Sequence, residues 1–240
     1  MCGRVYETYT DAELSIRYIR GTTPAVIPLF ETVYNLCPTM NSPVLRIVDG
    51  AHNFSLMHWQ LIPAYEPIFR TKLSTINAKS ETIFKSSLFK DIVVRQRCIV
   101  PISGFFEWKR TSKTKRPFKI HLKYEKIMSL AGIWDTWRPG TSHERSSFSI
   151  LTTAANSFMS EIHDRMPVIL GRQDEDAWLD PEVHEPEFLQ PLFKPCPSSW
   201  LTAMEVSPLV NSAKNNVAEL LDGVENGAAA VGQPRTLFEL

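Results

Sequence analysis

The chain has 240 residues, of which 43% are hydrophobic and 22% are charged. This composition is typical of a folded domain and excludes an intrinsically disordered chain. The 26 lysines and arginines balance the 26 aspartates and glutamates, so any nucleic-acid contact must use a local basic patch. The apolar runs are far shorter than the roughly 20 residues that span a bilayer, and no basic segment followed by an apolar one opens the chain. We therefore expect a soluble, cytoplasmic protein without membrane contact.

Two helices are predicted in the first part of the chain. Residues 11–20 form a short amphipathic helix, for which Asp11 is the candidate N-cap. A second helix begins at Ser80 and continues to residue 92, because apolar residues recur there at helical spacing.

Strand signals dominate the middle of the chain. Four runs rich in β-branched and aromatic residues are separated by Gly, Pro, Ser and Lys clusters, which is typical of strands and hairpins. They cover residues 97–108, 116–124, 126–134 and 146–155.

The last part of the chain is predicted to hold short helices. Asn156 caps one or two helical turns over 156–163, and further helices cover 172–179 and 212–221. The Pro-rich segment 188–200 is predicted to be a loop against the core. We therefore predict one α+β domain over residues 1–222 and a flexible C-terminal tail over residues 223–240.

The four cysteines are widely spaced along the chain: Cys2, Cys37, Cys98 and Cys196. They give neither a disulfide framework nor the close pairs of a zinc site, so we predict no metal. Nothing in the sequence calls for a small-molecule cofactor.

Cys2 is distinguished by its position directly behind the initiator methionine. Removal of Met1 would leave Cys2 with a free α-amine and a thiol on neighbouring carbons. An α-amine has a pKa of about 7.7 to 8.0, against about 10.4 for lysine, so far more of it is uncharged near neutral pH and able to attack a carbonyl.

Glu107 lies between two aromatic residues in the strand-like segment "PISGFFEW". One interpretation is a carboxylate on the solvent-facing side of the strand. The other is a carboxylate beside aromatic rings, whose raised pKa would suit proton transfer near neutrality.

His163, in "EIHDRMPVIL", ends a helical turn just before an apolar strand. It is either a structural hydrogen-bonding residue or a general acid or base. The neighbours Asp164 and Arg165 are predicted to form a surface ion pair, although Arg165 also suits a phosphate contact.

Asn77, in "TINAKSET", precedes the predicted helix N-terminus. It is either a capping or turn residue, or an amide that presents a donor and an acceptor to a substrate. In the second case Lys79 and the helix N-terminus would attract a phosphate.

Nine short segments in order, from residue 1 to about residue 211, carry a resemblance to a known family: "MCGR", "YNLCPT", "WQLIP", "TINAKSET", "CIVPISGFFEW", "SLAGIWDTW", "FSILTTAAN", "IHDRMPVIL" and "VSPLVN". In these segments the chain resembles the SOS-response-associated peptidase (SRAP) family. The resemblance implies a compact domain with a curved, barrel-like β core, flanked by short helices, and a groove for DNA. It also implies a monomer that removes its own Met1.

The resemblance implies a function for the exposed Cys2, which would form a covalent thiazolidine with an abasic site in single-stranded DNA. It further implies that Glu107 is the catalytic carboxylate, that Asn77 orients the amine and the sugar, and that His163 handles protons at the sugar ring oxygen. An associated lyase activity is implied as well.

The implied DNA groove is basic and aromatic, since phosphates fix the register of a strand and bases stack on flat side chains. The candidate DNA-binding residues are Arg4, Pro38, Thr39, Lys79 and Arg165.

Three residues depart from the family pattern, which usually has arginine at Lys79, tryptophan at Tyr65 and glycine at Gln60. Lysine keeps the positive charge but loses the bidentate fork of arginine. We expect DNA binding to be retained, with altered strength or strand preference.

Two alternatives remain open from the sequence. One is an N-terminal-nucleophile cysteine peptidase that cleaves other chains, with Cys2 attacking a peptide carbonyl. The other is a non-covalent reader of modified DNA, which would not need Cys2.

Overall fold

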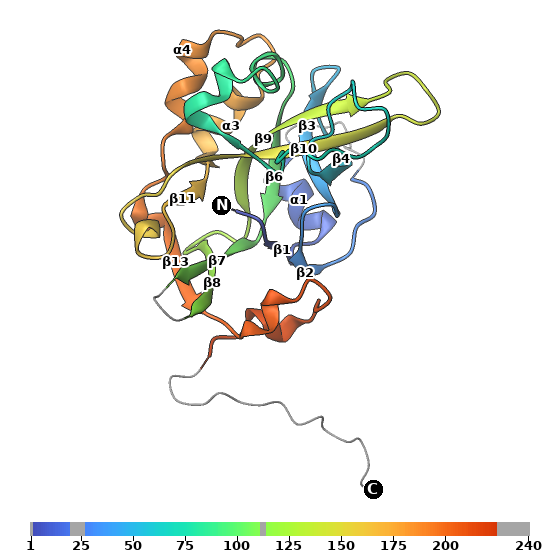
Figure 1. Cartoon of the computed structure of the whole chain (residues 1–240). Helices are drawn as coiled ribbons and strands as arrows, with labels where there is room; N and C mark the ends of the chain where they lie inside the picture. Colours follow the sequence, from blue (N-terminus) through green and yellow to red (C-terminus); the bar gives the residue numbers. More distant parts are fainter. Residues whose placement is uncertain (1, 20–26, 111–113, 225–240) are drawn as a thin grey trace, which may run out of the picture.

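The computed structural model describes residues 2–19, 27–110 and 114–224 of the chain. Two β-sheets form the centre of the domain, and short helices cover their outer faces (Figure 1). The predicted α+β class with a barrel-like β core is confirmed. Among the described residues, no helix has the length and apolar character needed to cross a bilayer.

The first sheet closes on itself, because each of five strands pairs with two others in a ring. Within this ring, only the β4–β10 pairing is parallel. A closed ring leaves no exposed strand edge, which removes the usual route to aggregation. In ring order the strands are β4 (Ala51–Trp59), β3 (Asn41–Val48), β6 (Arg97–Ile102), β9 (Met128–Trp137) and β10 (Arg145–Ala154).

Three short strands extend this sheet beyond the ring. β5 (Asn77–Lys79) runs parallel to β10, while β11 (Arg165–Pro167) runs antiparallel to it. β12 (Ile169–Leu170) pairs with β9. These additions bring the segments that contain Asn77 and Arg165 to the same long strand.

The second sheet is antiparallel throughout. Its strands, in order, are β13 (Leu201–Glu205), β8 (Lys115–Leu122), β7 (Gly104–Arg110), β1 (Val5–Glu7) and β2 (Val33–Leu36). The strand-rich run predicted over 97–108 forms two strands, because β6 and β7 belong to different sheets with Ser103 between them. A Cβ on Gly104 would lie 2.5 Å from the Ile120 carbonyl oxygen, so this crossing point requires glycine.

The barrel strands are apolar on both faces. Neighbouring residues such as Val44 and Leu45, or Ile150 and Leu151, belong to two different buried clusters. One cluster reaches the second sheet and includes Cys2, and the other packs under the helices. Cys2 is therefore part of the core that joins the two sheets.

Two predicted helices are confirmed. α1 (Asp11–Tyr18) begins one residue after its N-cap, which is Thr10 rather than the predicted Asp11. Thr10 and Glu13 form a reciprocal capping box, and this pair satisfies two backbone donors at the helix start. α3 (Arg172–Leu179) has the predicted bounds and carries Asp174 and Glu175 in its first turn.

The predicted helix over 80–92 is wrong, because the segment forms a 3-10 helix, η1 (Ser80–Lys85), and a short α2 (Lys90–Val93). The Ser86 N–H closes η1 on the carbonyls of Thr82 and Ile83, and its backbone is then extended. The Ser86 hydroxyl accepts a hydrogen bond from the Leu88 N–H, which favours a turn over a continuous helix.

The predicted helix over 212–221 is also wrong, since only η6 (Ala218–Leu221) is helical. The side-chain amide of Asn35 donates to the carbonyls of Ser212 and Asn215, which a helix would need for its own hydrogen bonds. These contacts fasten the C-terminal segment to β2.

The remaining short helices lie between residues 156 and 211. Asn156 caps a turn as predicted, because its side-chain oxygen accepts from the Met159 N–H at 2.8 Å. The predicted loop over 188–200 contains helical turns, and a proline stands in the first two positions of α4 and of η3, where its fixed φ suits a helix start. The elements are η2 (Met159–Glu161), α4 (Pro186–Leu189), η3 (Gln190–Phe193), η4 (Ser198–Trp200) and η5 (Pro208–Asn211).

The predicted tail over 223–240 lies outside the described residues from residue 225 onward. Gly223 and Val224 are described, and both pair with the end of β13 through backbone contacts to Val206 and Glu205. The domain boundary at residue 222 stays a prediction.

Glu7 is a buried carboxylic acid on β1, and it accepts a hydrogen bond from the Ser42 hydroxyl of β3. Burial raises the pKa of Glu7 to about 8, so the group is protonated in the folded protein at neutral pH. A carboxyl whose pKa is raised by folding stabilises the protein below its ordinary pKa, and this stability is lost as the pH rises through the folded value.

We expect the free energy of unfolding to decrease between about pH 4.5 and pH 8, by roughly 1.4 kcal/mol for each pH unit from this group alone. Glu7→Gln removes the ionisation, so its stability should decrease less over this range. Urea unfolding at several pH values measures the difference. Glu187→Gln, at an exposed carboxylate, is the matched control. Equal slopes in Glu7→Gln and the wild type would contradict the assignment.

Candidate active site

The N-terminal residues are held between the two sheets. The Asn77 side-chain amide on β5 donates to the Cys2 carbonyl at 2.9 Å. Two residues further on, the Arg4 carbonyl accepts from the Phe106 N–H of β7 at 2.9 Å. These hydrogen bonds fix Cys2 where the barrel meets the second sheet, next to the chain end marked N in Figure 1.

Cys2 is completely buried, with 0% of its surface exposed. Burial raises the pKa of the Cys2 thiol well above its ordinary value, and the nearby negative charge of Glu107 raises it further. The thiol is therefore protonated at neutral pH, and Cys2 is not a preformed thiolate.

Glu107 lies on β7 and is only 3% exposed, so the solvent-facing interpretation of this residue is wrong. One carboxylate oxygen accepts from the Trp108 N–H at 3.3 Å. The negative charge of Glu107 raises the pKa of the Cys2 thiol, and β7, which carries Glu107, pairs with β1, which begins three residues after Cys2.

Asn77 is also buried, with 7% of its surface exposed. Its amide holds Cys2 rather than the start of the following helix, so the capping interpretation is wrong. The side-chain oxygen is buried and accepts no hydrogen bond from any of the described residues. Asn77 thus contributes its donor to Cys2 and keeps its acceptor for a further donor.

His163 follows η2 and is largely buried. Its Nδ1 lies 2.9 Å from the Arg165 N–H and 2.9 Å from the carboxylate of Asp164. Because the backbone N–H can only donate and the Asp164 side chain is 88% exposed, we assign Nδ1 as the acceptor. The neutral ring then carries its proton on Nε2 and can donate it.

A cavity of about 430 Å³ connects several of these side chains. Glu107 and His163 both line it, although they are 56 residues apart in the sequence. Trp108 and Asn211 line it as well and are joined by a hydrogen bond of 2.7 Å from the indole N–H. Sequence analysis left Trp108 without a role and missed Asn211, whose only signal was its position at the end of "VSPLVN".

The predicted DNA-binding arginines are engaged within the domain. Arg4 donates to the Asn35 side chain and the Val210 carbonyl, and its guanidinium lies 5.8 Å from the centre of the Trp108 ring. Arg165 forms a two-pronged ion pair with Glu81. The predicted pair between Asp164 and Arg165 is therefore wrong.

Lys79 ends β5 and is exposed, and its side chain has no hydrogen bond or ion pair with the described residues. It lies two residues from Asn77 on the same short strand. Among the predicted cationic contacts, Lys79 is the one whose charge is open to an external anion.

Pro38 and Thr39 lie in the turn between β2 and β3, and among the described residues no hydrogen bond joins them to Cys2. Thr39 is exposed and has a φ of 77°, an unfavourable value for a β-branched residue. Its N–H donates to the Trp59 carbonyl at 2.7 Å. Gln60, which follows Trp59, has a φ of 148°, a value that favours glycine. Gln60 therefore carries backbone strain at a position where the family pattern usually has glycine.

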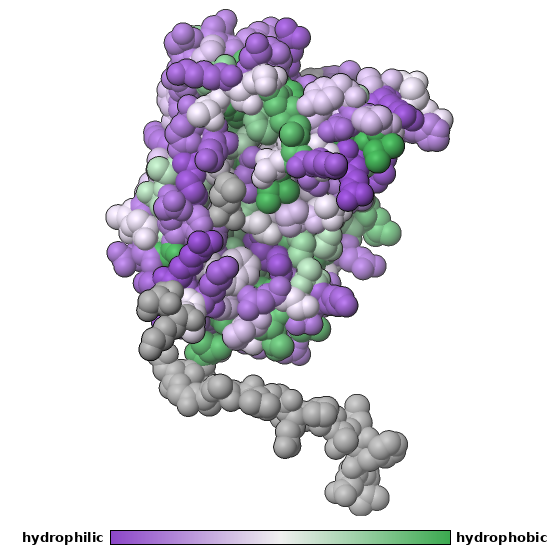
Figure 2. All heavy atoms as spheres, in the orientation of Figure 1, coloured by the Kyte–Doolittle hydropathy of each residue, from purple (hydrophilic) through white to green (hydrophobic). Residues whose placement is uncertain are grey.

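Figure 2 shows that this face is mainly hydrophilic, with small apolar areas near its centre. Among the described residues, no group of three or more His, Cys, Asp or Glu side chains is arranged to hold a metal ion. The site therefore consists of a buried N-terminal cysteine, a carboxylate, an amide and an imidazole.

These features define a domain with a closed β-barrel and a cysteine at position 2 that is buried in the core. Its sequence matches the family described as SOS response associated peptidase (SRAP) over residues 1–213. The chain belongs to this family.

Named relatives cover most of the chain. The abasic site processing protein YoaM of Bacillus subtilis is 41% identical over 196 residues, which cover 80% of this chain and 86% of that protein. The abasic site processing protein HMCES of Xenopus tropicalis is 30% identical over 227 residues, covering 81% of this chain and 67% of that protein. A crystal structure of a Bacteroides thetaiotaomicron protein has a TM-score of 0.80 at 27% identity and covers 93% of this chain and 100% of that chain.

The hydrogen bond from Asn77 to the Cys2 carbonyl generates a prediction about thiol reactivity. Asn77→Ala removes a bond with a net value of about 1 kcal/mol, so the N-terminal segment should open more often. We expect a thiol reagent to modify Cys2 about 5- to 10-fold faster in this variant. Peptide mass spectrometry identifies the modified cysteine.

Cys98 is an internal control, because it is buried on β6 in the same cluster as Cys2 but has no hydrogen bond with Asn77. Its modification rate should not change. An unchanged rate at Cys2, or equal acceleration at both cysteines, would contradict a local anchoring role for Asn77.

Proposed function

We propose that the protein removes its own Met1 and then links Cys2 covalently to an abasic site in single-stranded DNA. The observation that carries the proposal is the Asn77 hydrogen bond that fixes the Cys2 main chain beside Glu107. The names of the relatives support abasic sites as the substrate. The protein acts as a monomer, since one chain supplies all four side chains.

The first step exposes the nucleophiles. Hydrolysis of the Met1–Cys2 peptide bond consumes one water, releases methionine and leaves a free α-amine on Cys2. The buried Glu107 carboxylate would accept a proton from that water and return it to the departing nitrogen, which regenerates the carboxylate. The carboxylate can then take a proton from the Cys2 ammonium group, so that the amine can attack.

The second step joins Cys2 to the sugar. The ring-opened deoxyribose presents an aldehyde, and the amine adds to it to give an imine with loss of one water. The Cys2 thiol then adds across the C=N bond, its sulfur bonds to carbon, and its proton passes to nitrogen. The product is a five-membered thiazolidine. From aldehyde to thiazolidine, this second step releases one water in total.

Two further side chains suit this sequence. The Nε2–H of His163 can donate to the sugar ring oxygen as the ring opens, which unmasks the aldehyde. The buried Asn77 oxygen can accept a hydrogen bond from the α-amine and hold it toward the sugar.

The raised thiol pKa favours this order of events. A protonated thiol is a poor nucleophile, so the amine attacks first and the thiol closes the ring within the same complex. An imine that escapes ring closure can undergo β-elimination at the sugar. That competition accounts for the proposed lyase activity as a minor reaction.

The test uses single-stranded DNA with one abasic site and a denaturing gel. The wild type should form an adduct without any reductant. Cys2→Ala, with its methionine removed, should give an adduct only with borohydride, because its amine forms an imine but cannot close a ring. An adduct of equal yield from Cys2→Ala without reductant contradicts the proposal.

Glu107→Gln should slow adduct formation by about 10²-fold or more, the usual contribution of a general acid or base. Glu161→Gln is the matched control, since that carboxylate is 79% exposed near the same groove. In a cell-free reaction without methionine aminopeptidase, the wild type should lose Met1 and Glu107→Gln should retain it. Cleavage of unrelated peptides in place of DNA adducts would instead favour a peptidase that acts on other chains.

A further inference from the structure

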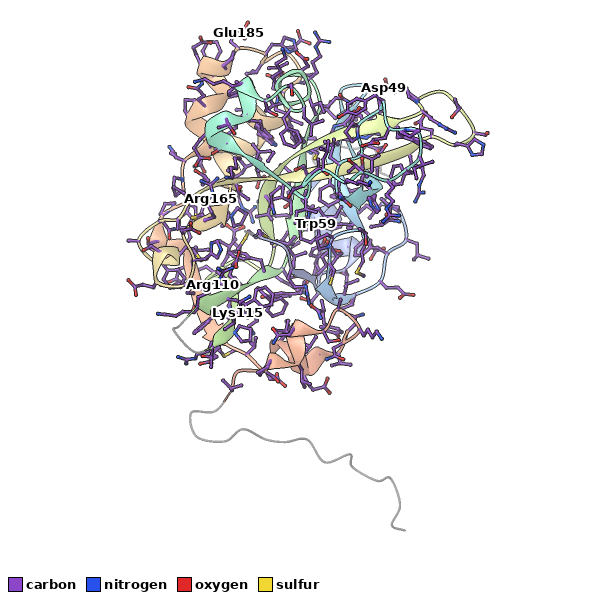
Figure 3. The ribbon with its side chains drawn as sticks, in the orientation of Figure 1. Asp49, Trp59, Arg110, Lys115, Arg165 and Glu185 are labelled. Carbon is purple, nitrogen blue, oxygen red and sulfur yellow. The ribbon has the colours of Figure 1, made fainter. Side chains whose placement is uncertain are left out.

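A pair of uncompensated positive charges lies at the end of the β7–β8 hairpin. Arg110, the last residue of β7, is directly opposite Lys115, the first residue of β8. Both side chains are exposed, and Figure 3 labels them close together at the lower left of the drawn face. Like charges directly opposite on two strands destabilise a sheet.

In the neighbouring cross-strand pair of this hairpin, carboxylates neutralise both positive charges. Lys109 and Arg116 are also directly opposite, and each has a carboxylate partner. Lys109 lies 4.0 Å from Glu161, and Arg116 makes a two-pronged ion pair with Glu205. Among the described residues, neither Arg110 nor Lys115 has a carboxylate within ion-pair distance. One pair is neutralised by the protein, and the other is left for an external anion.

The uncompensated pair also faces the candidate active site. Arg110 and Lys115 line the 430 Å³ cavity together with Glu107 and His163. Arg110 also lines an adjoining cavity of about 520 Å³, and so does His163. An anion held by this pair therefore lies in the same groove as the proposed reacting groups.

We propose that Arg110 and Lys115 form a clamp for the backbone phosphates of the nucleic acid strand next to the reacting sugar. This inference rests on the proposed function for its choice of DNA as the ligand. The guanidinium can bind two phosphate oxygens at once, and the ammonium acts as a point charge beside it. Bound phosphate removes the repulsion between the two side chains, so the charge pair is stabilised by substrate rather than by the fold.

The position of Trp108 favours a nucleic acid strand over an acidic peptide. Trp108 is two residues before Arg110, so strand alternation puts both side chains on one face of β7. A flat indole beside two phosphate-binding cations is the arrangement expected for single-stranded nucleic acid, whose bases stack while its phosphates are held.

The test measures the salt dependence of noncovalent binding to a single-stranded oligonucleotide without an abasic site. The variant Arg110→Gln/Lys115→Gln should lower the magnitude of the slope of log K against log salt by about 1.4, or by about 0.7 if both residues share one phosphate. The conservative variant Arg110→Lys/Lys115→Arg should keep most of the slope. The control Lys90→Gln/Lys123→Gln removes the same charge from exposed lysines outside the groove and should keep the wild-type slope.

Equal slopes for the hairpin variant and the control overturn the clamp, as does the absence of salt-dependent binding in the wild type. A preference of the wild type for acidic peptide over the oligonucleotide also overturns it. Because the oligonucleotide has no aldehyde, these outcomes do not depend on Cys2. A reduced slope in the hairpin variant, with no adduct from the wild type on abasic DNA, supports the clamp while the proposed covalent reaction fails.

Discussion

The fixed position of Cys2 is the constraint on which the site depends. Chain ends are usually loose, yet here the Cys2 carbonyl is bound to Asn77 of the barrel, and the Arg4 carbonyl to Phe106 of the second sheet. Burial at this junction keeps the thiol protonated beside Glu107. The arrangement fixes Cys2 in position and keeps its thiol protonated, and the proposed reaction depends on both properties.

The sequence predicted the α+β class and the central strands, because those runs are rich in β-branched and aromatic residues. It did not predict β1 to β4, which are interrupted by polar residues such as Ser42 and Asn53. Nor did it predict the ring closure, which depends on the parallel pairing of β4 with β10, two strands that are about 90 residues apart. Two predicted helices were wrong because Ser86 and Asn35 compete for backbone groups that a helix needs.

Four site residues could be chosen from local sequence and resemblance, but their geometry could not. From the sequence, Glu107 could be either an exposed or a buried strand residue, and only the fold shows that it is buried. The partner of Arg165 is Glu81, which lies 84 residues away, rather than the adjacent Asp164. The charge pair of Arg110 and Lys115 could not be recognised from the sequence, because only the register of the hairpin shows that the two residues lie opposite each other.

The most direct measurement is mass spectrometry of the N-terminal peptide after the wild-type protein has reacted with abasic single-stranded DNA and both polymers have been digested. The account predicts a peptide that begins at Cys2 and carries the sugar with loss of one water. Its thiol should be blocked and its mass unchanged by borohydride, because a closed ring has no C=N bond to reduce. A sugar attached to a lysine side chain, a free Cys2 thiol in the adduct, or retention of Met1 in the linked peptide would contradict it.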